Sequence, residues 1–174
     1  MSMTWRALFA RPYVKVLEAD KDAGIPGSGG TVVAEWSAVG AGAEGCTDTA
    51  RVFRLSDEDV YPWHARFEPM TMFYIDGASA VDSEDDHWLL FAVTRQAPDG
   101  SWGLLSFATV YEFFVYGPDC TAQRARLSQI IVLPPFQRQG MGGRVLEAVR
   151  AHAVGCSMQD ITVGRCRLTL STPR

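Results

Sequence analysis

The segment from Gln137 to Gly143 has the residue types of an anion-binding loop. It follows the apolar run Leu127–Leu133 and two prolines, and it leads into a stretch with helical periodicity. The first N–H groups of a helix have no intrahelical partner and lie at the positive end of the helix dipole, so they can bind phosphate. Glycines let the backbone approach such a ligand closely. The segment predicts a phosphate cradle; the alternative is a glycine-rich turn that only starts a helix.

The order of residues in this loop excludes two common phosphate-binding motifs. No Lys-Ser/Thr pair follows the glycines, as a Walker loop requires, and there is no Gly-x-Gly-x-x-Gly dinucleotide fingerprint. What remains is Gln-x-x-Gly-x-Gly after an apolar strand, with a basic residue for a charge-assisted contact. The predicted cradle consists of Gln137, Arg138, Gln139, Gly140, Met141, Gly142 and Gly143.

Two helical patterns flank the predicted strands. After the cradle, an apolar residue recurs every fourth position, at Met141, Val145, Val149 and Ala153, which indicates one buried helix face. Upstream, Trp63, Phe67, Met70 and Tyr74 also fall on one helical face. Pro69 lies inside this second pattern and is expected to kink or split it. Ser56 and Asp57 are the expected caps of the upstream helix.

Short apolar runs bounded by turn residues predict the strands. The run Leu104–Tyr116 is apolar on both faces, as in a central strand. A turn built on Pro98, Asp99 and Gly100 precedes it. Strands followed by strand, loop, helix and strand predict an α/β or α+β sheet with helices on its faces. The expected strands are Tyr13–Leu17, Thr31–Trp36, Arg51–Leu55, Trp88–Arg95, Leu104–Tyr116, Leu127–Leu133 and Gln159–Val163.

Composition limits the class of protein. With 174 residues, of which 47% are hydrophobic, the chain can form one well-packed domain. A net charge of −4 argues against direct binding of nucleic acid. No apolar run approaches the roughly 20 residues that cross a bilayer, so no membrane association is expected. The four cysteines and three histidines lack metal-ligand spacing, so no metal is expected, and the cysteines are interpreted as buried free thiols. Cytoplasmic and nuclear localisation is expected.

Several motifs in consistent order resemble one family. Gln137-x-x-Gly140-x-Gly142 resembles the coenzyme A signature of the GNAT acetyltransferase superfamily. The longer segments are similar to the catalytic subunit of type B histone acetyltransferases, from about Arg51 to Val163. They are Leu127 to Gly143, His64-Ala-Arg-Phe, Phe73 to Asp82 with Trp88, Thr109 to Tyr116, and Asp160-Ile-Thr-Val.

This resemblance implies a GNAT-type fold, with a mixed splayed central sheet flanked by helices. It implies residues 51–174 as the acetyltransferase domain and residues 1–50 as a strand and loop segment left from an N-terminal domain. It further implies transfer of acetyl from acetyl-CoA to a lysine amine of a histone tail, of the histone four type, with a histone-chaperone subunit as a possible partner. The backbone of Ile130, Ile131 and Val132 would hold the acetyl and pantetheine portion, and Gln137 to Gly143 the pyrophosphate.

The resemblance also assigns the substrate side of the site. Trp88 and Tyr111 match positions that line the lysine channel, where aromatic walls suit the apolar stem and cationic head of lysine. Asp76 matches an acidic residue near the reacting amine and could accept its proton. From pattern alone, both aromatic residues read equally well as core, and Asp76 as a turn former. The acidic run Asp82–Asp86 is interpreted as a solvated turn.

The sequence departs from the family after Val163. There the family has Glu-Asp-Pro-Ser, whose acidic pair is a leading candidate for the general base, whereas no carboxylate follows Asp160 in this chain. The basic tail Gly164–Arg174 fits no family element, so the sheet is expected to be incomplete on its C-terminal side. Three hypotheses stay open: an active histone acetyltransferase, an impaired module that binds acetyl-CoA without the base, and a GNAT N-acetyltransferase for another amine.

Overall fold

A single sheet forms the centre of the molecule. The computed structural model describes residues 30–38, 43–98, 100, 102–115 and 123–163, and the backbone of 166–169; the predicted strand Tyr13–Leu17 lies outside these residues. Within them the strands follow one another in sheet order, and only the β5–β6 pair is parallel. The strands are β1 (Thr31–Ser37), β2 (Thr47–Arg54), β3 (Trp88–Gln96), β4 (Trp102–Phe114), β5 (Gln123–Val132), β6 (Asp160–Val163) and β7 (Cys166–Thr169).

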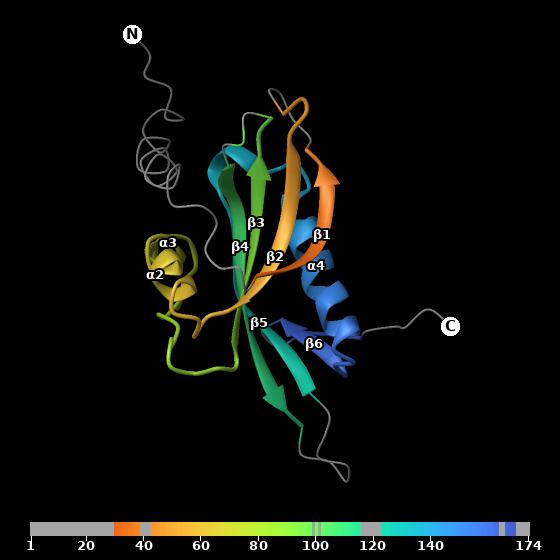
Figure 1. The fold of residues 1–174 in the computed structure, drawn as a ribbon. Helices are drawn as coiled ribbons and strands as arrows, with labels where there is room; N and C mark the ends of the chain where they lie inside the picture. The colour runs from red at the N-terminus through yellow and green to blue at the C-terminus, as the bar shows by residue number, and fades with distance from the viewer. Residues whose placement is uncertain are drawn as a thin grey trace, which may run out of the picture.

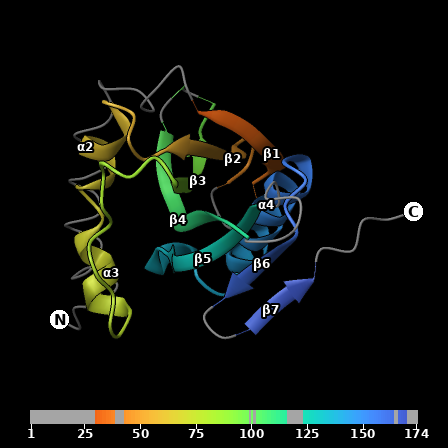
Figure 2. The ribbon, with the colours of Figure 1, turned by 90° about the horizontal axis from the view of Figure 1, so that it is seen from below.

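Helices cover both faces of this sheet. The long helix α4 (Met141–Gly155) packs on one face, and α2 (Val60–His64) and α3 (Pro69–Tyr74) lie on the other (Figures 1 and 2). A short 3-10 helix, η1 (Pro134–Phe136), connects β5 to the approach of α4. The predicted fold class, a mixed α/β or α+β sheet flanked by helices, is confirmed.

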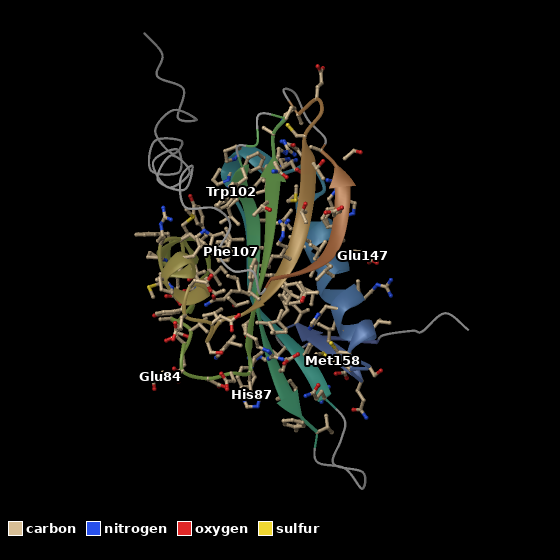
Figure 3. The ribbon with its side chains drawn as sticks, viewed as in Figure 1. Glu84, His87, Trp102, Phe107, Glu147 and Met158 are labelled. Carbon is tan, nitrogen blue, oxygen red and sulfur yellow. The ribbon has the colours of Figure 1, made fainter. Side chains whose placement is uncertain are left out.

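The two faces of the sheet bury separate apolar cores. The α4 core contains the predicted stripe of Met141, Val145, Val149 and Ala153, packed on side chains of β2 to β6. The α2–α3 core is aromatic, with the ring centroids of Phe67 and Phe107 4.7 Å apart. Figure 3 shows Phe107 on the α2–α3 side of the sheet. β4 contributes to both cores, as predicted for a central strand.

A histidine lies inside the aromatic core. His64 is fully buried, and neither ring nitrogen has a hydrogen-bond partner. Its ring packs edge-on against Phe67 and Phe107. Burial lowers the pKa of His64 below its usual 6.5, while the carboxylate of Glu68, 4.0 Å from Nδ1, opposes this shift. His64 is therefore a neutral packing residue that resists protonation.

Pro69 splits the upstream helical pattern, as predicted. α2 ends at His64, and Pro69 is the first residue of α3, where its missing N–H breaks no intrahelical hydrogen bond. The predicted caps are wrong: the residue that precedes α2 is Asp59, and its side chain makes no capping hydrogen bond. Asp57 acts instead through its backbone, whose carbonyl accepts the N–H of Val60.

The C-terminal edge of the sheet also differs from expectation. β6 was expected to be the last strand, but Cys166–Thr169 pairs antiparallel with it as β7. Cys166-Arg167-Leu168-Thr169 does alternate apolar and polar residues. The strand was missed because the tail from Gly164 fitted no family element. At the other end, β2 runs across residues 50 and 51, where the boundary between the two segments was placed, and β1 and β2 are strands of the same sheet. The division into two segments stays a prediction.

Candidate active site

A bulge in β5 reverses which of its side chains point to each face of the sheet. Val110 of β4 lies opposite Leu127, and Thr109 lies opposite Gln129, so Ser128 is the extra residue. A bulge of this kind reverses which residues point to each face. Accordingly Leu127 lies in the α4 core, whereas Ile131, four residues later, lies in the α2–α3 core. The end of β5 is thereby rotated relative to its beginning.

Beyond the bulge, one edge of β5 pairs with no other strand of the described residues. The N–H of Leu133 donates to the carbonyl of Leu105 on the β4 side, which fixes the alternation of the antiparallel ladder. The backbone groups of Ile131 face β4 by this alternation, and those of Ile130 and Val132 face away from it. The parallel register with β6 ends at Leu127. Of the three residues predicted to hold the acetyl portion, Ile130 and Val132 therefore present backbone groups to an opening between β5 and β6.

The predicted cradle follows this open edge directly. The side-chain amide of Gln137 donates to the carbonyl of Val132 over 2.8 Å, and that of Gln139 donates to the carbonyl of Pro135 over 3.0 Å. Arg138 has a φ of 61°, a left-handed conformation that is uncommon for a residue with a side chain. Gly140 has a φ of 79° at the position just before α4. The two glutamines thus shape the loop, while the side chain of Arg138 is exposed to solvent.

The start of α4 leaves its first N–H groups available. No side chain caps the helix, and the first intrahelical bond in this turn runs from the N–H of Arg144 to the carbonyl of Gly140. The N–H groups of Met141, Gly142 and Gly143 therefore lack intrahelical acceptors. A Cβ at Gly143 would meet nothing within 4 Å, and one at Gly142 only the Val132 side chain at 3.9 Å. The glycines keep this helix end open to a ligand.

A buried ionic cluster fixes the cradle against the sheet. Asp48 is fully buried and binds Arg95 at 2.7 Å and Arg144 of α4 at 3.2 Å. Arg95 also stacks over Phe136, and Arg144 over Trp36. Both sides of the loop are thus tied to β1, β2 and β3. Sequence reasoning missed this cluster, because nothing in the spacing of its members joins residues 48, 95 and 144.

The predicted lysine-channel residues lie side by side. Trp88 and Tyr111 are directly opposite on β3 and β4, with ring centroids 4.9 Å apart, and both are partly buried. Tyr111 also lies 5.8 Å from the ring of His87. The partly exposed rings of Trp88 and Tyr111 form an aromatic surface of the kind that an alkylammonium group can approach.

The acidic run does more than form a solvated turn, because Asp85 belongs to the aromatic cluster. Its carboxylate accepts hydrogen bonds from the backbone N–H of His87 at 2.9 Å and lies 2.7 Å from the ring nitrogen Nδ1. These bonds, with a contribution from Tyr111, hold the pKa of Asp85 below its usual value. Burial raises the pKa of Tyr111, and Asp85 adds to the effect. A carboxylate that stays ionised therefore borders the aromatic pair.

Asp76 lies on the loop between α3 and β3. Its side chain is exposed, and Gly77 after it has a φ of 73°. α3, which this loop follows, contacts β5. No contact joins Asp76 to Trp88 or Tyr111 among the described residues, and its role stays a prediction.

Other features of the described residues border this site or lie outside it. A hollow of about 450 Å³ is lined by Arg54, Asp86, His87 and Glu112, among others. Since Glu112 and Tyr111 are adjacent on β4, they face opposite sides of the sheet. Burial of the thiols is wrong for Cys156, which is exposed and lies 3.6 Å from His152. The described residues contain no cluster of metal ligands, and none of their helices is long and apolar enough to cross a membrane.

Comparison with known proteins places the chain among homologues with one shared name. The histone acetyltransferase type B catalytic subunit of Rattus norvegicus is 38% identical over 104 residues, which cover 58% of this chain and 24% of that protein. The human subunit is 38% identical over 93 residues, covering 52% of this chain and 22% of its own length. The subunit of Arabidopsis thaliana is 33% identical over 103 residues, or 58% of this chain and 21% of that protein. No family model matches.

The chain therefore has clear relatives among type B histone acetyltransferase catalytic subunits, and the matched stretch spans about a quarter of their length. Similar solved structures include an aminoglycoside acetyltransferase from a soil metagenomic sample, with 17% identity and a TM-score of 0.48 over 68% of this chain and 78% of that one. Another is NAA60 of Arabidopsis thaliana in complex with acetyl-CoA, with 12% identity and a TM-score of 0.47 over 67% of this chain and 73% of that one.

Proposed function

We propose that this chain is a GNAT-type N-acetyltransferase domain that binds acetyl-CoA between β5 and α4 and transfers the acetyl group to a lysine of a histone tail, of the histone four type. The observation that carries the proposal is the open edge of β5 at Ile130 and Val132, which leads directly into the uncapped start of α4. The sequence relatives support a histone substrate, since all those compared carry that name.

The geometry suits the two ends of acetyl-CoA. The N–H groups at the start of α4 would bind the pyrophosphate, with Arg138 adding a charge-assisted contact. The N–H groups of Ile130 and Val132 would hold the acetyl and pantetheine end, where a backbone donor can stabilise a developing oxyanion. Bound there, acetyl-CoA supplies an acetyl thioester. Among the described residues, a Cβ added at Gly140 or Gly143 would meet no atom within 4 Å, which supports a ligand at this position.

Trp88, Tyr111 and Asp76 would bind and activate the lysine substrate. A lysine amine with a pKa near ~10.4 has to lose a proton before it can act as a nucleophile. Trp88 and Tyr111 would hold the alkyl stem of the lysine, and Asp76 would accept the proton, directly or through water. Asp85 would attract the basic tail. A histone-chaperone subunit as partner and a cytoplasmic and nuclear location belong to the same proposal, without direct contacts to nucleic acid or membrane.

A second candidate is a module that binds acetyl-CoA without transferring the acetyl group. The observation that favours it concerns Asp160, the carboxylate at the start of β6. Both carboxylate oxygens of Asp160 are engaged by Arg124, at 2.6 and 2.7 Å. Asp160 is therefore committed to an ion pair and is a poor proton acceptor.

The test is acetyl transfer from acetyl-CoA to a peptide of the histone four tail by the 174-residue chain. The active-enzyme proposal expects turnover that Asp76→Asn lowers by about a hundredfold, the range of general-base catalysis. Asp82→Asn, an exposed carboxylate on the same loop, is the matched control and should keep full activity. Binding of acetyl-CoA without turnover would favour the second candidate, and a panel of polyamines and peptide N-termini would reveal a different amine substrate.

A further inference from the structure

Gln129 is a buried polar side chain that the proposed function leaves without a role. It is 7% exposed and follows the bulge residue of β5 directly. On the same face of the strand lies Ile131, which belongs to the aromatic core. A primary amide at such a position is unfavourable unless its donor and acceptor are both satisfied.

Both ends of the Gln129 amide are engaged. Its oxygen accepts a hydrogen bond from the hydroxyl of Thr109, at 3.2 Å, across the β4–β5 pair. Its nitrogen donates to the backbone carbonyl of Ser79 over 2.8 Å. Ser79 belongs to the loop between α3 and β3, three residues after Asp76. Gln129 therefore joins that loop to the strand that carries the open edge.

A second buried side chain holds the same loop two residues further on. The carboxylate of Glu68, 7% exposed, accepts the backbone N–H of Val81 over 2.8 Å. The side chain of Val81 is itself buried in the aromatic core. The loop from Ser79 to Val81 is thus attached at two points, one to the sheet and one to the helical layer.

We propose that Gln129 is a positioning residue, which holds the loop bearing Asp76 at a fixed distance from the acetyl-binding edge of β5. The inference rests on the proposed function. Its geometric basis is continuity along the chain. The residue after Gln129 is Ile130, whose backbone would face the acetyl group. Asp76 lies three residues before Ser79, whose carbonyl accepts the hydrogen bond from Gln129. One amide thereby links the two halves of the reaction site without touching either substrate.

A matched pair of variants separates positioning from packing. Gln129→Met keeps the length of the side chain and loses both hydrogen bonds, including the one to the loop. Thr109→Val is nearly isosteric and removes only the bond across the sheet, leaving the Ser79 contact in place. Gln129→Glu is a second variant in which the acceptor for Thr109 is kept and the donor to Ser79 is lost when the carboxyl is ionised.

Two readouts test the proposal on the 174-residue chain. Gln129→Met should lower kcat with the histone four peptide by about tenfold, the factor expected for one lost buried hydrogen bond, with the KM for acetyl-CoA changed by less than about twofold. Hydrogen exchange of the backbone amides at residues 78–81 should rise by about tenfold in the same variant. Thr109→Val should leave both the exchange at 78–81 and kcat within about twofold of the wild type. Gln129→Glu should regain exchange protection as the pH falls and its carboxyl becomes a donor.

The outcomes distinguish this inference from the proposed function. Unchanged kcat and unchanged exchange in Gln129→Met would overturn the positioning role while leaving the enzyme proposal intact. An equal loss in Thr109→Val would also overturn it, because the effect would then be one of sheet packing. If the wild type shows no turnover at all, the proposed function fails, and the exchange measurement alone still decides whether Gln129 holds the loop.

Discussion

Replacing Gly142 by alanine should raise the stability of the protein and weaken its binding of acetyl-CoA. In Gly142→Ala the added methyl group would meet only the Val132 side chain at 3.9 Å, an ordinary contact, and Gly142 is the second residue of α4. Alanine is favoured over glycine in a helix by about 0.8–1.0 kcal/mol, less near an end. The variant should therefore be as stable as the wild type or more stable, with a rise in Tm of up to roughly 2–4 °C.

The same methyl group should weaken binding of acetyl-CoA. A helical Cβ points toward the N-terminus of its helix, which here is the side of the predicted pyrophosphate. Displacing the phosphate by even part of an ångström lengthens its hydrogen bonds to the first-turn N–H groups. Loss of one to two charge-assisted bonds, each worth about 1.5–3 kcal/mol, corresponds to a Kd at least about tenfold higher.

Calorimetric titration with acetyl-CoA and thermal unfolding without ligand measure the two effects. Gly155→Ala, at the opposite end of α4, is the control, since a Cβ there meets nothing within 4 Å. It should match Gly142→Ala in stability and the wild type in affinity. The reasoning is refuted if Gly142→Ala binds acetyl-CoA as tightly as the wild type. A loss of affinity shared with Gly155→Ala would refute it as well.

Three further predictions concern the frame of the site. Asp48→Asn should lower the free energy of unfolding, measured in urea titrations, by about 3–5 kcal/mol, because it leaves Arg95 and Arg144 without their shared carboxylate. Glu147→Gln breaks an exposed ion pair and should change this free energy by less than about 1 kcal/mol. Phe107→Ala should cost about 3–5 kcal/mol in the same assay, and Phe73→Ala, at a residue 84% exposed, about 0.5 kcal/mol or less. Burial lowers the pKa of His64, so its contribution to stability is present above its usual pKa of 6.5 and is lost as the pH falls below that value. His64→Phe should flatten the fall in Tm between pH 7 and pH 5, and an unchanged slope would contradict this origin.

Local patterns predicted most of the described strands and the buried face of α4 well, because short-range chemistry determines them. The apolar runs became β1, β3, β4, β5 and β6, and the four-residue stripe of α4 is buried as expected. Pro69 divided its helix because a proline lacks an N–H, a property visible in any sequence. β7 was missed although Cys166-Arg167-Leu168-Thr169 alternates apolar and polar residues, because the tail from Gly164 matched no family element and its pairing with β6 is not visible in the sequence.

Most parts of the site that sequence reasoning missed are long-range contacts. Asp48 meets Arg144 across 96 positions, and Gln129 meets Ser79 across 50. No spacing rule connects such pairs, and only the folded structure brings them together. Asp85 was similarly hidden inside an acidic run that looked solvated, although its hydrogen bonds to His87 depend on a local turn. A buried Asp or Gln between apolar positions of a strand is the one signal that could have indicated these contacts.

The most direct test of the account is to follow the backbone amides during a titration with acetyl-CoA by heteronuclear NMR. Binding at the proposed site should give saturable shifts that are largest at Ile130 and Val132 and at the first turn of α4, from Met141 to Gly143. The shifts in Gly142→Ala should be small at equal ligand concentration. An absence of saturable shifts would contradict it. So would shifts centred on the hollow beside Arg54 and Glu112.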